Sequence, residues 1–164
     1  MIPALTFLTL TSGDNHMGLD MRLEGQLNSY RMPQGVSSAL SSAISEMNGF
    51  ALESMMYELA YWRKANAVHN WFSQNIQGGV ENCGRYMVSD EMLENLKQDC
   101  VSVLEDNELA EQLMPSCSGF FFGSTDYDEG YIEDLKYTVK VINKIQESPF
   151  YQQGLLDVFY SADW

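Results

Sequence analysis

Apolar and polar residues alternate in two segments, and this alternation predicts two β-strands with one buried face each. In GLDMRLEG, residues 18–25, the apolar side carries Leu19, Met21 and Leu23. In ESMMYELAYW, residues 53–62, the side that collects the apolar residues carries Met55, Tyr57, Leu59 and Tyr61.

Other segments repeat their apolar residues at intervals of three and four, which is typical of amphipathic helices. These segments lie near 63–77, 90–105 and 127–146. Ser89 is expected to cap the second helix. Asp126, with Glu129 three residues later, resembles a capping box at the start of the third helix.

The remaining segments give weaker patterns. Short apolar runs predict strands in RYMVS, SGFFFGS and LLDVFYSADW, the second of them buried between glycines. Residues 25–49 are rich in Ser, Gly and Asn, which predicts an irregular segment with a short helix around 36–47. Residues 1–16 have neither the basic start nor the cleavage site of a signal peptide, so we do not interpret them as one.

The chain has 164 residues, of which 45% are hydrophobic, and this combination indicates one folded domain. Alternating strands together with separate helices favour an α+β fold. We therefore expect a single α+β domain in which a mostly antiparallel sheet is covered on one face by about three helices.

Cysteine and histidine usage limits the possible chemistry. The three cysteines form no CxxC pair, which argues against a disulfide framework or a zinc site and suits a reducing cytosol. His16 and His69 are the only histidines, and no apolar stretch is long enough to cross a bilayer. The sequence therefore predicts a cytoplasmic protein that needs neither a metal nor another cofactor.

The formal net charge is −14, and most of it lies in one third of the chain. Residues 81–135 carry fourteen acids against Arg85 and Lys97, a net charge of −12, whereas residues 1–80 carry a net charge of −2. Direct binding to nucleic acid needs a basic surface, and adsorption to an anionic membrane needs one as well. Both kinds of partner are therefore disfavoured.

The segment YWRKANAVHNWF, residues 61–72, combines four aromatic residues with two cations and a histidine. On a helix most of the aromatic residues share one side with His69, so we interpret the segment as a buried helix face with solvated cations. His69 is then expected to be a hydrogen-bonded core residue, because no Ser, Cys or Asp lies at the spacing of a known catalytic triad.

The segment GSTDYDEG, residues 123–130, is acidic but does not match a calcium-binding loop. Counted from Asp126, Gly130 and Tyr131 stand where that loop has its fifth and sixth residues, Asp and Gly. The carboxylates also disfavour phosphate at this helix start, although they suit the first turn of a helix.

Four stretches resemble, in this order, a small family of hypothetical proteins encoded in bacteriophage genomes: MGLDMRL, YWRKANAVHNWF, QGGVENCG and SGFFFGSTDYDEGYIEDL. The resemblance covers residues 17–24 and 60–146 and implies a phage or prophage origin with expression in the bacterial cytoplasm. It assigns no catalytic residue, because the family has no established activity. Its members usually begin at the position of Met17, so residues 1–16 are either an extra strand or an upstream start.

The first functional hypothesis is a phage accessory protein that binds and inhibits a basic host protein, for example as an anti-CRISPR or other anti-defence protein. Its acids would imitate the phosphates of DNA, and their attraction to a Lys- and Arg-rich groove would be long-ranged. The predicted contact residues are Glu91, Glu94, Glu105, Asp106, Glu108, Glu129, Glu133 and Asp134.

The second hypothesis is a small enzyme that acts on a nucleotide or a signalling metabolite. Its acid, base and anion-holding groups would come from Asp20, Arg63, His69 and Asp126, provided that the fold brings them together. An accessory or structural phage protein with another kind of partner is the remaining possibility.

Overall fold

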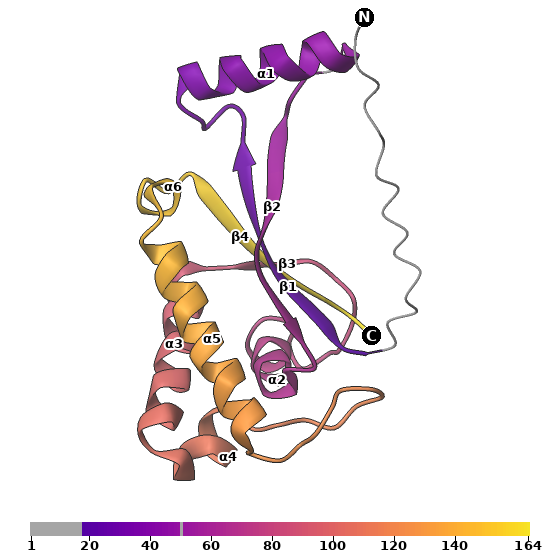
Figure 1. The fold of residues 1–164 in the computed structure, drawn as a ribbon, viewed down its shortest axis with the longest axis vertical. Coiled ribbons are helices and arrows are strands. Elements are labelled where there is room, and N and C mark those ends of the chain that lie inside the picture. The colour runs from indigo at the N-terminus through magenta and orange to yellow at the C-terminus, as the bar shows by residue number, and fades with distance from the viewer. Residues whose placement is uncertain (1–17, 50) are drawn as a thin grey trace, which may run out of the picture.

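The computed structural model describes residues 18–49 and 51–164, so the possible extension at residues 1–16 lies outside the described residues. Within the described ranges, antiparallel strands form one sheet in the order β2-β1-β4-β3 (Figure 1). The strands are β1 (Asp20–Asn28), β2 (Ser54–Arg63), β3 (Tyr86–Val88) and β4 (Leu156–Asp163).

Three helices pack against one face of this sheet and against each other, as the periodicity predicted. They are α2 (Asn66–Asn75), α3 (Asp90–Glu105) and α5 (Glu129–Gln146). The shorter helices are η1 (Asn107–Leu109), α4 (Ala110–Leu113) and α6 (Pro149–Gln152). The predicted fold class is therefore confirmed. No helix in the described part of the chain is long and apolar enough to cross a bilayer.

The core lies between the sheet and these helices. Leu19, Met21 and Leu23 are fully buried, as their alternation predicted. The indole Nε1 of Trp62 donates to Thr138 Oγ1 over 3.1 Å and thereby ties β2 to α5. The opposite face of the sheet is polar and carries ion pairs. Arg22 of β1 pairs with Asp163 of the neighbouring strand β4 at 3.3 Å, and Arg85, just before β3, reaches Glu24 of β1 at 3.0 Å.

The face predicted for part of β2 is wrong, because the strand contains a β-bulge. Leu23 lies opposite Ala60, but Glu24 lies opposite Glu58, so Leu59 is the extra residue on β2. The bulge reverses the alternation, because one additional residue moves the following side chains to the other face. Ala60 and Trp62 are therefore buried, whereas Tyr61, predicted to share the face of Leu59, is exposed.

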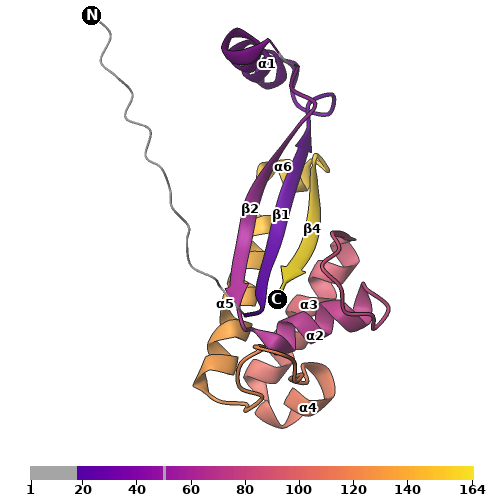
Figure 2. The ribbon, with the colours of Figure 1, turned by 90° about the vertical axis from the view of Figure 1, so that its right-hand side faces the viewer.

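The segment 25–49 is more regular than its composition predicted. Residues 25–28 continue β1, and residues 34–48 form helix α1 (Gln34–Asn48). Helix α1 closes the long β1–β2 hairpin and projects from its end, away from the other helices, in both views of the ribbon (Figures 1 and 2).

The predicted helix boundaries shift by a few residues. Helix α2 begins at Asn66, so Tyr61 and Trp62 belong to the preceding strand. Ser89 caps α3 and accepts a hydrogen bond from the Met92 amide at 3.2 Å, as predicted. The cap of α5 is Asp128 and not Asp126, because Asp128 accepts from the Tyr131 amide at 3.0 Å.

The predicted buried strand in SGFFFGS is wrong. Residues 115–127 connect α4 to α5 and contain turns and bends but no helix or strand. Phe122 is buried as expected, but Phe120 is 78% exposed. Strand periodicity does not apply here, because Phe121 has a φ of +65° and Gly123 a φ of +91°, both far from extended backbone.

Candidate functional site

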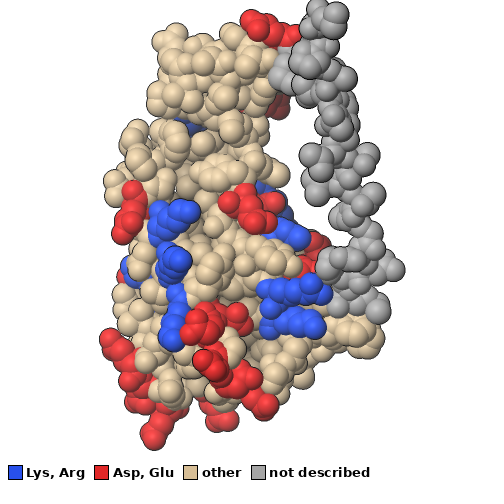
Figure 3. All heavy atoms as spheres, in the orientation of Figure 1, with Lys and Arg blue, Asp and Glu red and all other residues tan. Residues whose placement is uncertain are grey.

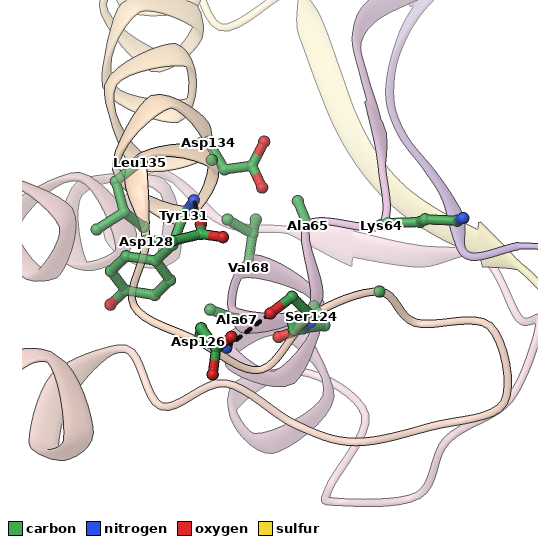
Figure 4. A pocket seen from close by; sticks show the side chains of 13 residues that line it. Lys64, Ala65, Ala67, Val68, Ser124, Asp126, Asp128, Tyr131, Asp134 and Leu135 are labelled. Atoms are coloured by element: carbon green, nitrogen blue, oxygen red, sulfur yellow. Dashed lines mark hydrogen bonds between the residues drawn. The ribbon is translucent and has the colours of Figure 1, made fainter.

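A cavity of about 210 Å³ opens where the starts of α2 and α5 meet the loop before α5 (Figure 4). Its apolar wall includes Val68 and Leu135, and its polar groups include three carboxylates, from Asp126, Asp128 and Asp134. Asp134 reaches out from α5 on the side of Ala65, whereas the Lys64 side chain extends away from the carboxylates. The cavity is therefore apolar at its walls and acidic along one side.

Strained backbone shapes one edge of the cavity. Lys64 has a φ of +62°, which a non-glycine residue rarely adopts, and its amide donates to the Leu19 carbonyl at 2.7 Å. A side chain at Gly123 would bring its Cβ to 3.1 Å from Lys64 Cβ. Gly123 thus allows the loop to approach the β2–α2 junction closely.

Asn66 fastens the loop to the first turn of α2. Its buried amide nitrogen donates to the carbonyls of Phe122 at 3.2 Å and Ser124 at 2.6 Å. Its side-chain oxygen accepts from the Cys117 amide at 3.2 Å. One side chain therefore satisfies three backbone groups of a loop that makes no ladder of its own.

Among the described residues, no cation forms an ion pair with the carboxylates around the cavity. Burial raises the pKa of Asp134 to about 6, and the neighbouring charge of Asp128 adds to this shift. No ion pair within the described residues includes Asp126, Asp128 or Asp134. Among these residues there is also no group of three or more His, Cys, Asp or Glu arranged to hold a metal ion.

Exposed acids gather beside the cavity at the end of the molecule where α3 finishes and α5 begins (Figure 3). The hydroxyl of Tyr131 donates to the Met114 carbonyl at 2.9 Å, which joins the start of α5 to the end of α4. We call this surface the acidic end and define it by Glu105, Asp106, Glu108, Glu111 and Glu129. In the described part of the chain, none of these five forms an ion pair.

The predicted contact residues are only partly brought together. Glu105, Asp106, Glu108 and Glu129 lie at the acidic end. Glu133 is on the next turn of α5 but pairs with Lys136 at 2.7 Å, and Asp134 lines the cavity. These residues therefore form one acidic region with different local environments.

Glu91 and Glu94 lie at the other end of α3. Glu94 accepts hydrogen bonds from Gln146 at 2.9 Å and Gln98 at 2.7 Å, and Lys97 lies at 3.0 Å. Together these contacts lower the pKa of Glu94 to about 2, and the hydrogen bond from Gln146 is the largest cause. Glu94 therefore already has partners within the chain and is not a member of the acidic end.

His69 is fully buried and hydrogen-bonded, as the sequence predicted. Its Nδ1 lies 2.7 Å from the Tyr160 hydroxyl, and its ring lies edge-on to Phe122 and Trp164. Burial lowers its pKa to about 4, so the imidazole is neutral at pH 7. Its Nε2 has no hydrogen-bond partner in the described part of the chain.

The residues of the predicted enzyme site lie in three separate places. Asp20 and Arg63 are opposite each other on β1 and β2, and the Tyr61 hydroxyl donates to Asp20. His69 is in the core, and Asp126 lines the cavity. The fold therefore does not assemble an acid, a base and an anion-binding group from these four residues.

Several residues of the site were not predicted from the sequence. Lys64 and Asn66 shape the cavity. Asp128 caps helix α5 and also lines the cavity. Glu111 joins the acidic end through the short helix α4. The high acid content of residues 81–135 was a signal for Glu111, whereas the contacts of Asn66 depend on a loop 51 to 58 positions away.

Comparison of the chain with protein-family models, curated proteins and solved structures found no match.

Proposed function

We propose that the chain is a phage accessory protein that binds and inhibits a basic host protein through the acidic end and the adjoining cavity. The observation that carries this proposal is the concentration, at one end of the molecule, of carboxylates that form no ion pair with another described residue. A host protein that binds nucleic acid presents the matching surface, since its Lys- and Arg-rich groove normally accommodates phosphates.

Charge segregation supports this orientation of binding. Lys136, Lys140 and Lys144 follow one side of α5 beyond the acidic end, and lysines line this helix in the space-filling view (Figure 3). A basic partner would be attracted to one end of the molecule and repelled by the lysines farther along the helix. Electrostatic complementarity of this kind favours fast, oriented association.

The cavity supplies a place for one anchoring side chain of the partner. Its volume of about 210 Å³ and its apolar wall suit the aliphatic part of a Lys or Arg side chain, and its carboxylates suit the charged group. Buried anchors of this kind often dominate the affinity of an interface. The surrounding acids would then contribute mainly to the rate of association.

The proposal is tested by capturing basic proteins from a host extract and measuring their affinity across a salt series. Reversal of three acids, in the variant E105K/E108K/E111K, should weaken binding strongly and reduce its salt dependence, because long-range attraction is lost. Each exposed substitution should change the free energy of unfolding by no more than about 0.5 kcal/mol, so the variant stays folded.

A matched control changes the net charge equally at other exposed sites. The variant E46K/E53K/E147K removes three exposed acids away from the acidic end, and in the described residues none of the three forms an ion pair. This control variant should bind the captured basic protein much more tightly than E105K/E108K/E111K does. Equal affinity of the two variants, binding that ignores salt, or failure to capture any basic protein would contradict the proposed function.

A further inference from the structure

The loop beside the cavity exposes two adjacent aromatic rings. Phe120 is 78% exposed and Phe121 is 39% exposed, whereas the next residue, Phe122, is only 2% exposed. The rings of Phe120 and Phe121 meet edge to face with their centroids 4.1 Å apart. A neighbouring pair of large apolar side chains on a surface is a common mark of an interaction site.

The backbone holds this pair in an unfavourable conformation. Phe121 has a φ of +65°, and Lys64 is the only other non-glycine residue with a positive φ in the described part of the chain. This conformation costs about 1 kcal/mol or more for a bulky residue. Phe121 nevertheless remains 39% exposed, so the core does not enclose its side chain.

The loop is nevertheless held firmly. Asn66 binds it at three backbone groups, and the Ser116 hydroxyl donates to the Thr125 carbonyl at 2.8 Å across its base. Phe122 anchors it between His69 and Trp164, with ring centroids 5.2 and 5.7 Å away. Phe120 and Phe121 are therefore presented on a preorganised support, which reduces the entropy lost on binding.

The charges of the loop indicate what the rings would contact. Residues 115–128 contain no Lys or Arg, and Asp126 and Asp128 follow the aromatic pair, whereas the one cation packed against the loop at Gly123 among the described residues is Lys64. A phenyl face attracts cations, and the planar guanidinium group stacks on it better than an ammonium group does. The carboxylates of Asp126 and Asp128, which line the adjoining cavity, can accept hydrogen bonds from guanidinium groups on the same partner surface.

From these observations we infer that Phe120 and Phe121 form an arginine-binding aromatic contact, through which the chain distinguishes arginine-rich from lysine-rich basic surfaces. This inference rests on the proposed function and names the kind of side chain that the partner presents.

Octa-arginine and octa-lysine peptides are suitable probes, because they carry equal charge. The wild-type chain should bind octa-arginine more tightly, and F120A/F121A should lower the affinity for octa-arginine by at least about tenfold while leaving octa-lysine nearly unchanged. Y30A is the matched control, since Tyr30 is 81% exposed and belongs to the segment between β1 and α1, which Figure 1 shows at the opposite end of the molecule from the start of α5. It should keep the preference for arginine.

The acidic end gives a second, separable comparison. E105K/E108K/E111K should weaken binding of both peptides by similar factors and keep the preference for arginine. Suppose that it does so, but that F120A/F121A leaves the preference for arginine unchanged or lowers the affinity for both peptides equally. The inferred aromatic contact is then wrong, and the proposed function stands. If the wild-type chain binds neither peptide, both are wrong.

The variants F121G and F121A separate the effect of the Phe121 ring on binding from its effect on stability. Glycine relieves the positive φ, so F121G should melt at a higher temperature than F121A. Both variants should nevertheless lose the preference for arginine. An F121G variant that keeps this preference would overturn the contact, because the ring would then be dispensable.

Discussion

At the scale of single residues, His69 and Asp134 show how burial sets charge in this protein. The pKa of His69 falls to about 4 and that of Asp134 rises to about 6, because burial disfavours the charged form of each group. His69 is consequently neutral at pH 7, and Asp134 carries its proton until the pH approaches 6. Each group therefore makes stability depend on pH over its own range.

We expect H69A to lower the free energy of unfolding by about 1 to 3 kcal/mol at pH 7, because Tyr160 loses its buried partner. The unfolded chain takes up a proton near pH 6.5 and the folded chain only near pH 4. The stability that depends on neutral His69 is therefore present above pH 6.5 and falls as the pH drops toward 4. Denaturant titrations at pH 7 and pH 4 should show the difference from wild type narrowing at low pH.

Binding tests the role of His69 separately from stability. Affinity for a basic partner, measured per folded molecule, should be unchanged in H69A at neutral pH. A variant that keeps its melting temperature but loses binding would contradict the interpretation of His69 as a core residue.

The substitution D134N should stabilise the fold at pH 7 and have little effect at pH 4. The pKa of Asp134 is about 6 in the folded state and 3.8 as a model value, so ionisation reduces stability as the pH rises from about 4 to 6. We expect a gain of about 1 kcal/mol at pH 7, since partial exposure screens the charge. Thermal melts across this pH range measure it, and an equal gain at pH 4 would contradict the explanation.

At the scale of elements, the loop before α5 depends on a residue of α2. N66A leaves the carbonyls of Phe122 and Ser124 without their donor, so we expect a loss of about 1 to 3 kcal/mol. Amide hydrogen exchange should rise in residues 117–125. N75A at the end of the same helix is the control, because the Asn75 amide contacts only the Trp71 carbonyl of its own helix. Equal exchange in the two variants would show that Asn66 does not fasten the loop.

Periodicity predicted the elements well where one face of each is buried along its whole length. Leu19, Met21 and Leu23 in β1 and Leu93, Leu96 and Cys100 in α3 are buried as their spacing indicated. The prediction failed where a single residue changes the pattern. The bulge at Leu59 reverses the face of β2, and the positive φ of Phe121 removes residues 118–124 from any regular element.

The candidate site was less predictable than the fold. The sequence placed acids at Glu105, Asp106, Glu108 and Glu129, and these do share one end of the molecule. It could not place the cavity, because the cavity forms where Lys64 and Asn66 meet a loop about 60 residues later. Contacts between irregular segments leave no periodic signal in the sequence.

At the scale of the whole molecule, the acidic residues are more concentrated in space than along the sequence. Helices α3 and α5 run in opposite directions, so the acids that end one and begin the other share one end of the molecule. Antiparallel packing thereby brings Glu105, at the end of α3, to the same end of the molecule as Glu129, which lies 24 positions later in the sequence. The acidic end is a product of topology as well as of composition.

The position of α1 has a consequence for how the chain tolerates being cut. Strands β1 and β2 pair along their full length, from Asp20 opposite Arg63 to Asn28 opposite Ser54, and α1 lies beyond the last pair. A peptide bond broken within α1 breaks no strand pairing. None of the described side chains of α1 is fully buried, although Leu40 packs against the core. The two resulting fragments would each carry one strand of the hairpin, and the extensive β1–β2 pairing would hold them together. The end of the hairpin is thus a natural place to split the protein or to insert a label.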